Sequence, residues 1–336
     1  MEPPRLKTER LLLREFRAAD VEPDLEQARD PEVQRFLGGL RDPYDAFRTL
    51  ATHAGHWALR GHGQWIVERR EDGAFLGRVG LWSPPGWPGI EVGWRLGRAA
   101  WGKGYATEAA RAAVGWAWTV LGLEQLSSMI VSDNAPSQRV AQRLGQVNTG
   151  PVQLPVGTAD QWVLTRPPGD EPWALREASV ADAPRIAEQV RDAMARFRDI
   201  SPPGWTPPDH ADAEVAEALA APGHRGVVAE PGGVLAGHVT WRPSVDARRG
   251  PRAEDAAYLG QIYVEPGWWG SQLASRLLRI AVEGARDDGF ARIHLVTPAG
   301  QGRARRFYER EGWRTVGAPI DDERFGMPTV EYAREL

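Results

Sequence analysis

The sequence predicts an α/β (α+β) protein made of two similar domains in tandem, each a mixed, mostly antiparallel sheet flanked by helices. The chain has 336 residues, more than a single hydrophobic core usually organises. Short strand-like segments alternate with longer helical segments in each half, which is typical of a sheet covered by helices. Several short motifs of the first half also return, in the same order, in the second half.

The internal repeat is clearest near the start of each half. The residues LRE at 13–15 and AD at 19–20 return at 175–177 and 181–182, in both cases 162 positions later. Further along, Trp101-Gly102 returns as Trp269-Gly270. Two ordered copies of one unit explain this pattern better than chance does.

The seam between the copies is predicted at Pro167-Pro168-Gly169-Asp170-Glu171-Pro172, because adjacent prolines and a glycine disfavour both helix and central strand. This places a first domain at 1–166, a linker at 167–172 and a second domain at 173–336. In the first domain we expect strands at 11–16, 65–68, 76–82, 90–96 and 126–131, with a long helix at 105–121. In the second we expect strands at 174–177, 226–230, 235–241, 258–264 and 292–296, with a long helix at 273–286.

A loop rich in small residues, 101–109 (WGKGYATEA), lies between a predicted strand and the long helix of the first copy. Small residues let backbone N–H groups converge, and a helix N-terminus adds positive potential, so such a loop suits a pyrophosphate. An ordinary tight turn between strand and helix explains the same spacing equally well.

Several motifs in order resemble the ribosomal-protein N-terminal acetyltransferases of the Rim type, within the GNAT superfamily of acyl-CoA N-acyltransferases. They are 8–14 (TERLLLR), 91–96 (EVGWRL), 101–106 (WGKGYA) and 134–137 (NAPS), which together span most of the first domain. The superfamily loop reads Gln/Arg-x-x-Gly-x-Gly/Ala. Here Trp101 takes the Gln/Arg place, Gly104 the first small position and Ala106 the second.

The resemblance implies an acetyl-CoA-dependent N-acetyltransferase that acts on a primary amine, either a peptide or protein N-terminus or a small-molecule amine such as an antibiotic or biosynthetic intermediate. The alternative is a non-catalytic acyl-CoA-binding or scaffold protein. The residues that the resemblance assigns to acetyl-CoA are Trp94, Arg95 and Leu96 beside the pantetheine arm, Trp101, Gly102, Lys103, Gly104, Tyr105, Ala106 and Thr107 in the pyrophosphate loop, and Asn134 opposite the arm.

Acetyl transfer needs a group that deprotonates the ammonium and one that protonates the departing thiolate. The resemblance implies Glu91 as the base, although a solvent-facing strand residue is the plain alternative. It also implies Ser137 as the proton donor, whereas a serine at this place is often a helix N-cap. Ala141 stands where many GNAT enzymes carry a general-acid tyrosine.

The second copy shows the reverse pattern. Its residues 307–313 (FYEREGW) resemble the last-helix motif of single-domain GNAT enzymes, so Tyr308 is either the general acid or a core aromatic. Gln272, however, stands where the first copy has Gly104, and a side chain there would crowd the pyrophosphate or force a different backbone geometry. Gln301 replaces the usual asparagine. The second copy is therefore interpreted as a degenerate domain that binds acetyl-CoA poorly.

Composition limits the remaining functions. Cysteine is absent, which excludes disulfides and thiolate chemistry. The spacing of His53, His56 and His62 fits no zinc pattern, so no metal is expected. We expect these histidines at the surface or in the substrate cleft. A net charge of −4 argues against nucleic acid. The apolar run 112–123 is too short to span a bilayer. We expect a cytoplasmic protein, monomeric if its two domains mimic a dimer.

Overall fold

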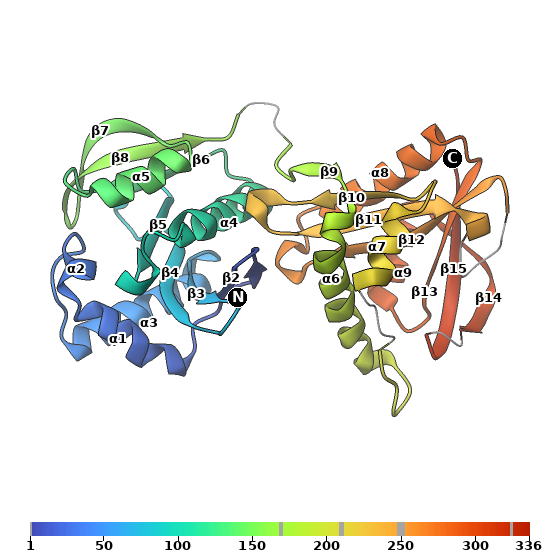
Figure 1. Ribbon diagram of the computed structural model, residues 1–336, viewed down its shortest axis with the longest axis horizontal. Helices are drawn as coiled ribbons and strands as arrows, with labels where there is room; N and C mark the ends of the chain where they lie inside the picture. The colour runs from blue at the N-terminus through green and yellow to red at the C-terminus, as the bar shows by residue number, and fades with distance from the viewer. Residues whose placement is uncertain (1, 168–170, 208–211, 247–252, 323–324) are drawn as a thin grey trace. The chain divides into compact units, whose positions relative to one another are not determined.

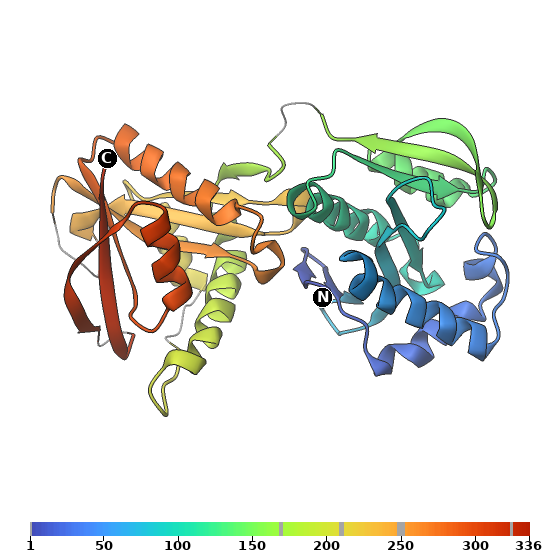
Figure 2. The ribbon, with the colours of Figure 1, turned by 180° about the vertical axis from the view of Figure 1, so that it is seen from behind.

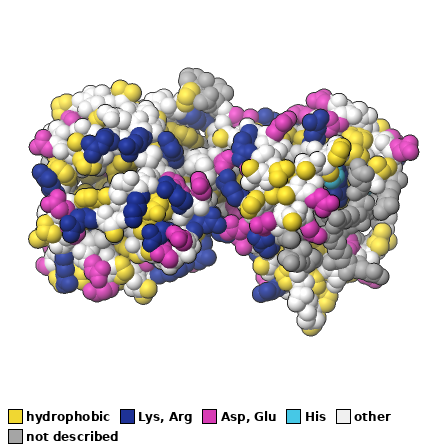
Figure 3. Space-filling model, in the orientation of Figure 1, with side chains coloured by type: hydrophobic (Ala, Val, Ile, Leu, Met, Phe, Trp, Pro, Cys, Tyr) yellow, Lys and Arg dark blue, Asp and Glu magenta, His cyan; other side chains and the backbone are white. Residues whose placement is uncertain are grey.

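The structure is a computed structural model that describes residues 2–167, 171–207, 212–246, 253–322 and 325–336. They form two compact units, Met1–Ala174 with Pro231–Val234, and Leu175–Glu230 with Leu235–Leu336. Of the expected linker, residues 168–170 lie outside the described part. Side chains of both charge signs are interspersed on the face that Figure 3 shows.

The first unit has one eight-stranded sheet in the order β1-β2-β3-β4-β5-β6-β8-β7 (Figure 1). All neighbouring strands are antiparallel except β5 and β6, which are parallel. The strands are β1 (Leu6–Lys7), β2 (Leu11–Arg14), β3 (Gln64–Arg69), β4 (Phe75–Trp82), β5 (Glu91–Leu96), β6 (Gln125–Ile130), β7 (Val147–Leu154) and β8 (Gly157–Thr165). The helices are α1 (Val21–Ala28), α2 (Pro31–Gln34), α3 (Pro43–Arg60), α4 (Tyr105–Val120) and α5 (Ala135–Arg143).

The second unit repeats this plan in a seven-stranded sheet of order β14-β15-β13-β12-β11-β10-β9, seen from behind in Figure 2. Here β12 and β13 are the parallel pair. The strands are β9 (Leu175–Glu177), β10 (Arg225–Ala229), β11 (Gly237–Pro243), β12 (Ala256–Val264), β13 (Arg292–Pro298), β14 (Arg314–Asp322) and β15 (Met327–Glu335). The helices are α6 (Ala183–Ala195), α7 (Asp212–Ala220), α8 (Leu273–Asp287) and α9 (Gly302–Arg310).

The expected fold class is confirmed, with mixed, mostly antiparallel sheets flanked by helices in each unit. The strand expected over 11–16 ends at Arg14, because the chain turns there into the short 3₁₀ helix Ala18–Asp20. The strand expected over 235–241 begins only at Gly237. The sequence analysis did not predict the last two strands of either sheet.

Helix α4 is the central helix of the first unit and packs on β2, β4 and β5. Its alanine-rich sequence buries Ala109, Ala110, Ala112 and Ala113 fully, so the helix lies close to the sheet. The rings of Trp57, Trp65 and Trp116 meet edge to face at centroid distances of 4.8–5.5 Å, which joins α3, β3 and α4. Within the described residues no helix combines the length and the apolar character needed to cross a membrane.

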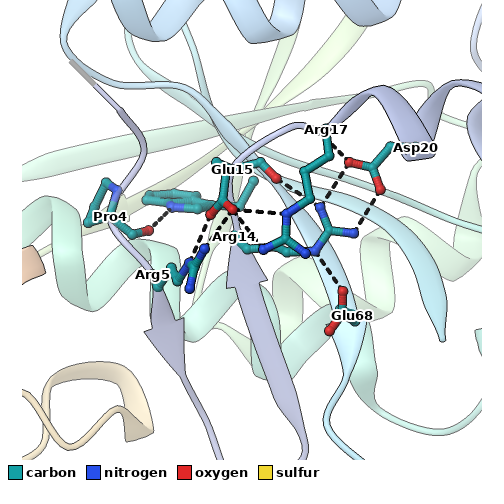
Figure 4. A network of polar contacts seen from close by, with 8 residues as sticks. Pro4, Arg5, Arg14, Glu15, Arg17, Asp20 and Glu68 are labelled. Atoms are coloured by element: carbon teal, nitrogen blue, oxygen red, sulfur yellow. Dashed lines mark hydrogen bonds and ion pairs between the residues drawn. The ribbon is translucent and has the colours of Figure 1, made fainter. Parts of the chain in front are cut away.

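A buried arginine ties β2 to the 3₁₀ helix Ala18–Asp20 (Figure 4). Arg14 donates to both carboxylate oxygens of Asp20, at 2.9 and 2.7 Å, and to Glu68 at 2.6 Å. Asp20 also accepts the backbone N–H of Arg17 at 2.7 Å. Asp20 is only 2% exposed, so its charge depends on these donors for compensation.

The second unit contains the same arrangement. Arg176 donates to Asp182 at 2.8 and 2.7 Å and to Glu230, and Asp182 accepts the backbone N–H of Ser179. The LRE and AD motifs therefore recur because each copy needs one bidentate arginine–aspartate pair at the start of its sheet.

Asp20→Asn should destabilise the protein by roughly 3 kcal/mol, because it removes one charge of a buried pair while Glu68 still pairs with Arg14. Chemical denaturation of the two proteins measures the difference. Asp72→Asn is the matched control, since the Arg69–Asp72 pair is exposed and its loss should leave stability unchanged. Equal effects of the two substitutions would contradict the role of the Arg14 network.

Candidate active site

The two parallel strands of the first sheet separate almost as soon as they meet. Glu91 of β5 is paired with Ser127 of β6, and no further register pair joins these strands. The carbonyl of Val92 still faces β6, where it accepts the hydroxyl of Ser128 at 2.6 Å. Backbone groups alternate sides along a strand, so the N–H and C=O of Trp94 also face the gap. An extended ligand that enters this gap finds a strand edge with which it can pair.

The second unit opens in the same way. Residues Ala256–Tyr258 of β12 pair with Arg292–His294 of β13, after which the two strands diverge. A cavity of about 1150 Å³ lies in this unit. Its lining includes Ile262, Trp269, Gln272, Gln301 and Tyr308.

The loops that precede α4 and α8 have the same backbone. Gly104 caps α4 with φ 81° and ψ −1°, and Gln272 caps α8 with φ 70° and ψ 1°. The expectation that glutamine forces a different geometry is therefore wrong: Gln272 accepts the left-handed conformation, at a cost of about 1 kcal/mol. The two loop tryptophans match as well, since Trp101 donates to the carbonyl of Leu96 and Trp269 to that of Val264, both at 2.8 Å.

A polar network that was not expected from the sequence holds the loop between β5 and α4. Arg10 donates to the carbonyl of Lys103 at 3.0 Å and to Glu108 at 2.7 Å, and its guanidinium lies over the ring of Tyr105. Thr8 donates to the same carboxylate at 2.5 Å. This explains part of the 8–14 motif, because its threonine and first arginine fix the loop that follows β5.

Glu91 lies at the point where β5 and β6 separate. Its carboxylate accepts the indole N–H of Trp87 at 2.7 Å and the backbone N–H of Met129 at 3.4 Å. Burial raises the pKa of Glu91 to about 7, against the lowering effect of these two hydrogen bonds. Glu91 is partly buried, which differs from a fully solvent-facing strand residue, and the group changes protonation in the range where a general base works best.

Ser137 lies close to the gap without being the helix cap. Asn134 is the N-cap of α5, and its side chain accepts the backbone N–H of Ser137 at 3.2 Å. The N-cap alternative for Ser137 is thus wrong. Its hydroxyl instead accepts the indole N–H of Trp94 at 3.3 Å and keeps its own proton available for donation.

The second unit combines a tyrosine with a strand, β12, that lacks a carboxylate. Tyr308 is 7% exposed, lines the cavity and contacts the rings of Phe307, Trp313 and Tyr332. Burial raises the pKa of its hydroxyl above the usual value. No acidic residue occurs along β12, so nothing on this strand corresponds to Glu91. Gln301 begins α9 at the place of Asn134 but makes no capping bond with its side chain.

Two of the three clustered histidines are structural. His56 and His62 are buried, and His56 accepts the N–H of Ser83 while its other ring nitrogen bonds to the carbonyl of His62 at 2.7 Å. Their placement at the surface is therefore wrong. The ring of His53 packs at a tilt against that of Trp82, with a centroid distance of 4.5 Å, and burial holds the pKa of His53 well below the usual value.

Comparison with known families decides the identity of the fold. A family model described as "Acetyltransferase (GNAT) domain" matches residues 10–147, and one described as "Acetyltransferase (GNAT) family" matches residues 190–313. The chain belongs to the GNAT acetyltransferase family. It is an acetyltransferase with two GNAT domains in tandem.

Relatives of this GNAT acetyltransferase match one half of the chain. "Uncharacterized protein YkkB" of Bacillus subtilis is 30% identical over 118 residues, 34% of this chain and 69% of the relative. "Uncharacterized N-acetyltransferase YjgM" of Escherichia coli is 29% identical, over 48% of this chain and 94% of the relative. "Uncharacterized N-acetyltransferase YoaA" of Bacillus subtilis is 26% identical, over 42% and 82%.

Solved GNAT structures also resemble one half of the chain. An acetyltransferase from Agrobacterium tumefaciens is 29% identical with a TM-score of 0.46, over 49% of this chain and 96% of that one. The putative acetyltransferase yncA from Salmonella typhimurium, solved with its cofactor acetyl-CoA, is 20% identical with a TM-score of 0.40, over 48% and 92%.

Glu91→Gln should change the pH dependence of stability of this acetyltransferase. The folded pKa of about 7 lies above the unfolded value, so the unfolded chain ionises first and wild-type stability falls as pH rises from about 4.5 to 7. Glutamine cannot ionise, so the melting temperature of the variant minus that of wild type should increase from pH 5 to pH 8. Glu71→Gln, at an exposed position, is the control. A parallel shift in both variants would contradict the raised pKa.

Proposed function

We propose that the first unit is an acetyl-CoA-dependent N-acetyltransferase that acts on a primary amine, with Glu91 as its general base. One observation carries the proposal: a carboxyl group with a pKa of about 7 lies where the two central strands part. A base that is half ionised near neutral pH both accepts a proton readily and is regenerated readily.

The residues of the first unit fit acetyl-CoA in three places. The backbone N–H and C=O of Trp94, with its neighbours Arg95 and Leu96, offer the strand edge for the pantetheine arm. The loop from Trp101 to Thr107 offers N–H groups to the pyrophosphate at the start of α4. Thr107 is 6% exposed and its hydroxyl has no hydrogen-bond partner among the described residues, which leaves it available to a phosphate oxygen. Asn134 keeps its amide N–H group for the arm.

Acetyl transfer requires two proton transfers, one from the ammonium of the acceptor and one to the departing thiolate. Glu91 takes a proton from the ammonium, directly or through water, so that the amine nitrogen attacks the thioester carbonyl. The C–N bond forms and the C–S bond breaks. Ser137 donates its proton to the departing thiolate, and the indole N–H of Trp94 holds its oxygen in place. Ala141, in the tyrosine position, is fully buried and takes no part.

The acceptor is a primary amine of one of two kinds. The resemblance of residues 91–106 to Rim-type enzymes favours a peptide or protein α-amino group. A small-molecule amine uses the same base and the same thioester. Kinetic assays with acetyl-CoA and both classes of amine test the choice.

A second candidate concerns the second unit, for which we propose non-catalytic acyl-CoA binding. Its cavity and the retained backbone of the loop at Gln272 favour a bound ligand. The absence of a carboxylate along β12 argues against chemistry by the same mechanism. In this proposal Tyr308 shapes the cavity as an aromatic side chain.

Gly104→Gln should weaken acetyl-CoA binding about tenfold or more. The left-handed backbone tolerates glutamine, as at Gln272, but a Cβ at 104 already lies 3.4 Å from the guanidinium of Arg10, and the longer side chain enters the loop. Calorimetric titration measures the loss. Gly61→Gln is the matched control, because Gly61 has φ 72° with open space around it and ends α3. Unchanged affinity in Gly104→Gln would remove the loop from the proposed site.

Glu91→Gln should lower kcat about 10²- to 10⁴-fold and abolish the rise of rate through pH 7, since a base must be deprotonated to act. The dissociation constant of acetyl-CoA should stay within a factor of a few. Tyr308→Phe is the companion variant and should retain near-normal turnover, because only a hydroxyl is lost. A dead Tyr308→Phe enzyme beside a full-rate Glu91→Gln enzyme would transfer catalysis to the second unit.

A further inference from the structure

The sheet face that carries Glu91 also carries two arginines. In the register of β4 and β5, Trp82 lies opposite Glu91, Gly80 opposite Gly93, and Arg78 opposite Arg95. Side chains two and four residues apart on a strand point to the same face, so Glu91, Gly93 and Arg95 share one side of β5. The Cα atoms of Glu91 and Arg95 are about 13 Å apart at the usual rise of a strand.

Both arginines are buried, and they share one carboxylate. The side chains of Arg78 and Arg95 are 8% and 6% exposed. Asp24 of α1 accepts a hydrogen bond from Arg95 and lies 3.7 Å from Arg78, beyond hydrogen-bond reach. Two guanidinium groups against one carboxylate leave an excess positive charge inside the unit, which is expensive unless an anion compensates it.

Some N–H donors of Arg78 and Arg95 make no hydrogen bond in the described part of the chain. Within the described residues, Nη1 of Arg78 and Nε of Arg95 have no hydrogen-bond partner although both atoms are buried. Burial, together with the positive charge of Arg95, lowers the pKa of Arg78 to about 9. Buried donors of this kind are rarely left unsatisfied in a folded protein.

Among the described residues, Asp24 is the acidic group that pairs with these two arginines, and the neighbouring charge of Arg41 is positive. Burial is the largest cause of the low pKa of His53, and the positive charges of Arg78, Arg95 and Arg41 add to it. Arg41 is itself engaged by Thr49 and by the carbonyl of Leu37. The Nδ1 atom of His53 has no partner in the described part of the chain. The whole region is therefore polar, cationic and incompletely hydrogen-bonded.

We propose that Arg78 and Arg95 bind a carboxylate of the acceptor, so that the substrate is a small amine that carries a carboxylate group several bonds from its reactive nitrogen. This rests on the proposed function of Glu91. The amine lies at the Glu91 end of the face and the carboxylate at the Arg78 end. Gly80 and Gly93 carry no side chains between them, and the side-chain amide of Gln64 lies beside Gly93.

A small molecule fits this arrangement better than a polypeptide. Helix α1 packs on β4 and supplies Asp24, so the arginine end of the face is covered. Glu91 and Gly93 retain partial exposure, whereas Arg78 and Arg95 are buried. A substrate whose amine is at Glu91 therefore ends at the arginines, where a protein chain would have to continue.

The test compares unbranched ω-amino acids, from β-alanine to 8-aminooctanoate, with the corresponding ω-amino amides. Wild type should prefer the acid over the amide at its best chain length by about tenfold or more in kcat/KM, as a charge-assisted hydrogen bond allows. Arg78→Met should reduce this ratio to about 1, and Arg78→Lys should keep part of it. Arg48→Met is the control, because this arginine of α3 is 64% exposed, and it should leave the ratio unchanged.

The melting temperature of Arg78→Met shows whether the variant has lost only the contact with the carboxylate or has lost its fold. Arg78→Met leaves the Asp24–Arg95 pair neutral overall, so its melting temperature should equal or exceed that of wild type. The best acid, and not its amide, should raise the melting temperature of wild type but not of Arg78→Met. This second readout decides the proposal even if neither series is acetylated, an outcome that would count against the proposed function itself.

Acetylation of amides and acids at equal rates, together with equal thermal shifts, would overturn the carboxylate site while leaving the acetyltransferase assignment intact. A C-terminally amidated octapeptide with a higher kcat/KM than every ω-amino acid would overturn the small-molecule acceptor.

Discussion

The proposed active site of the first unit depends on the separation of β5 from β6. Parallel strands normally pair along their length, and unpaired backbone groups inside a protein are costly. Here pairing stops after Glu91 and Ser127, and the exposed strand edge is left to an extended ligand. The same separation encloses the carboxylate of Glu91 between strands, which raises its pKa. One topological feature therefore accounts for both the unpaired strand edge and the raised carboxyl pKa on which the proposed acetyl transfer depends.

Sequence reasoning found the features that follow from local spacing. The repeated LRE and AD motifs predicted two copies, and the structure gives the reason in the bidentate pairs of Arg14 with Asp20 and of Arg176 with Asp182. The glycine-rich segment before α4 likewise predicted a loop at a helix N-terminus, where Gly104 takes the left-handed conformation. Both are short-range features, since each motif contains the residues that make the contact or the turn.

Other parts of the site depend on contacts between segments distant in sequence. The pairing of Arg10 with Glu108 spans 98 positions, and that of Asp24 with Arg95 spans 71. Composition and periodicity carry no information about such pairs. The backbone of Gln272 was also beyond sequence reasoning, because a glutamine normally avoids positive φ and only the surrounding loop holds it there. Strands β7 and β14 of the last hairpins were missed because their residues are mostly exposed and show little hydrophobic pattern.

The two units have diverged in complementary directions. The first has a glutamate with a raised pKa and a cationic face. The second has apolar and amide side chains along β12, together with the same loop backbone, a buried tyrosine and a cavity of about 1150 Å³. Holding Gln272 in a left-handed conformation costs free energy that an unused loop has no reason to retain. This geometry supports the proposal that the second unit binds a ligand through its loop, while the proposed proton transfer of acetylation rests with Glu91.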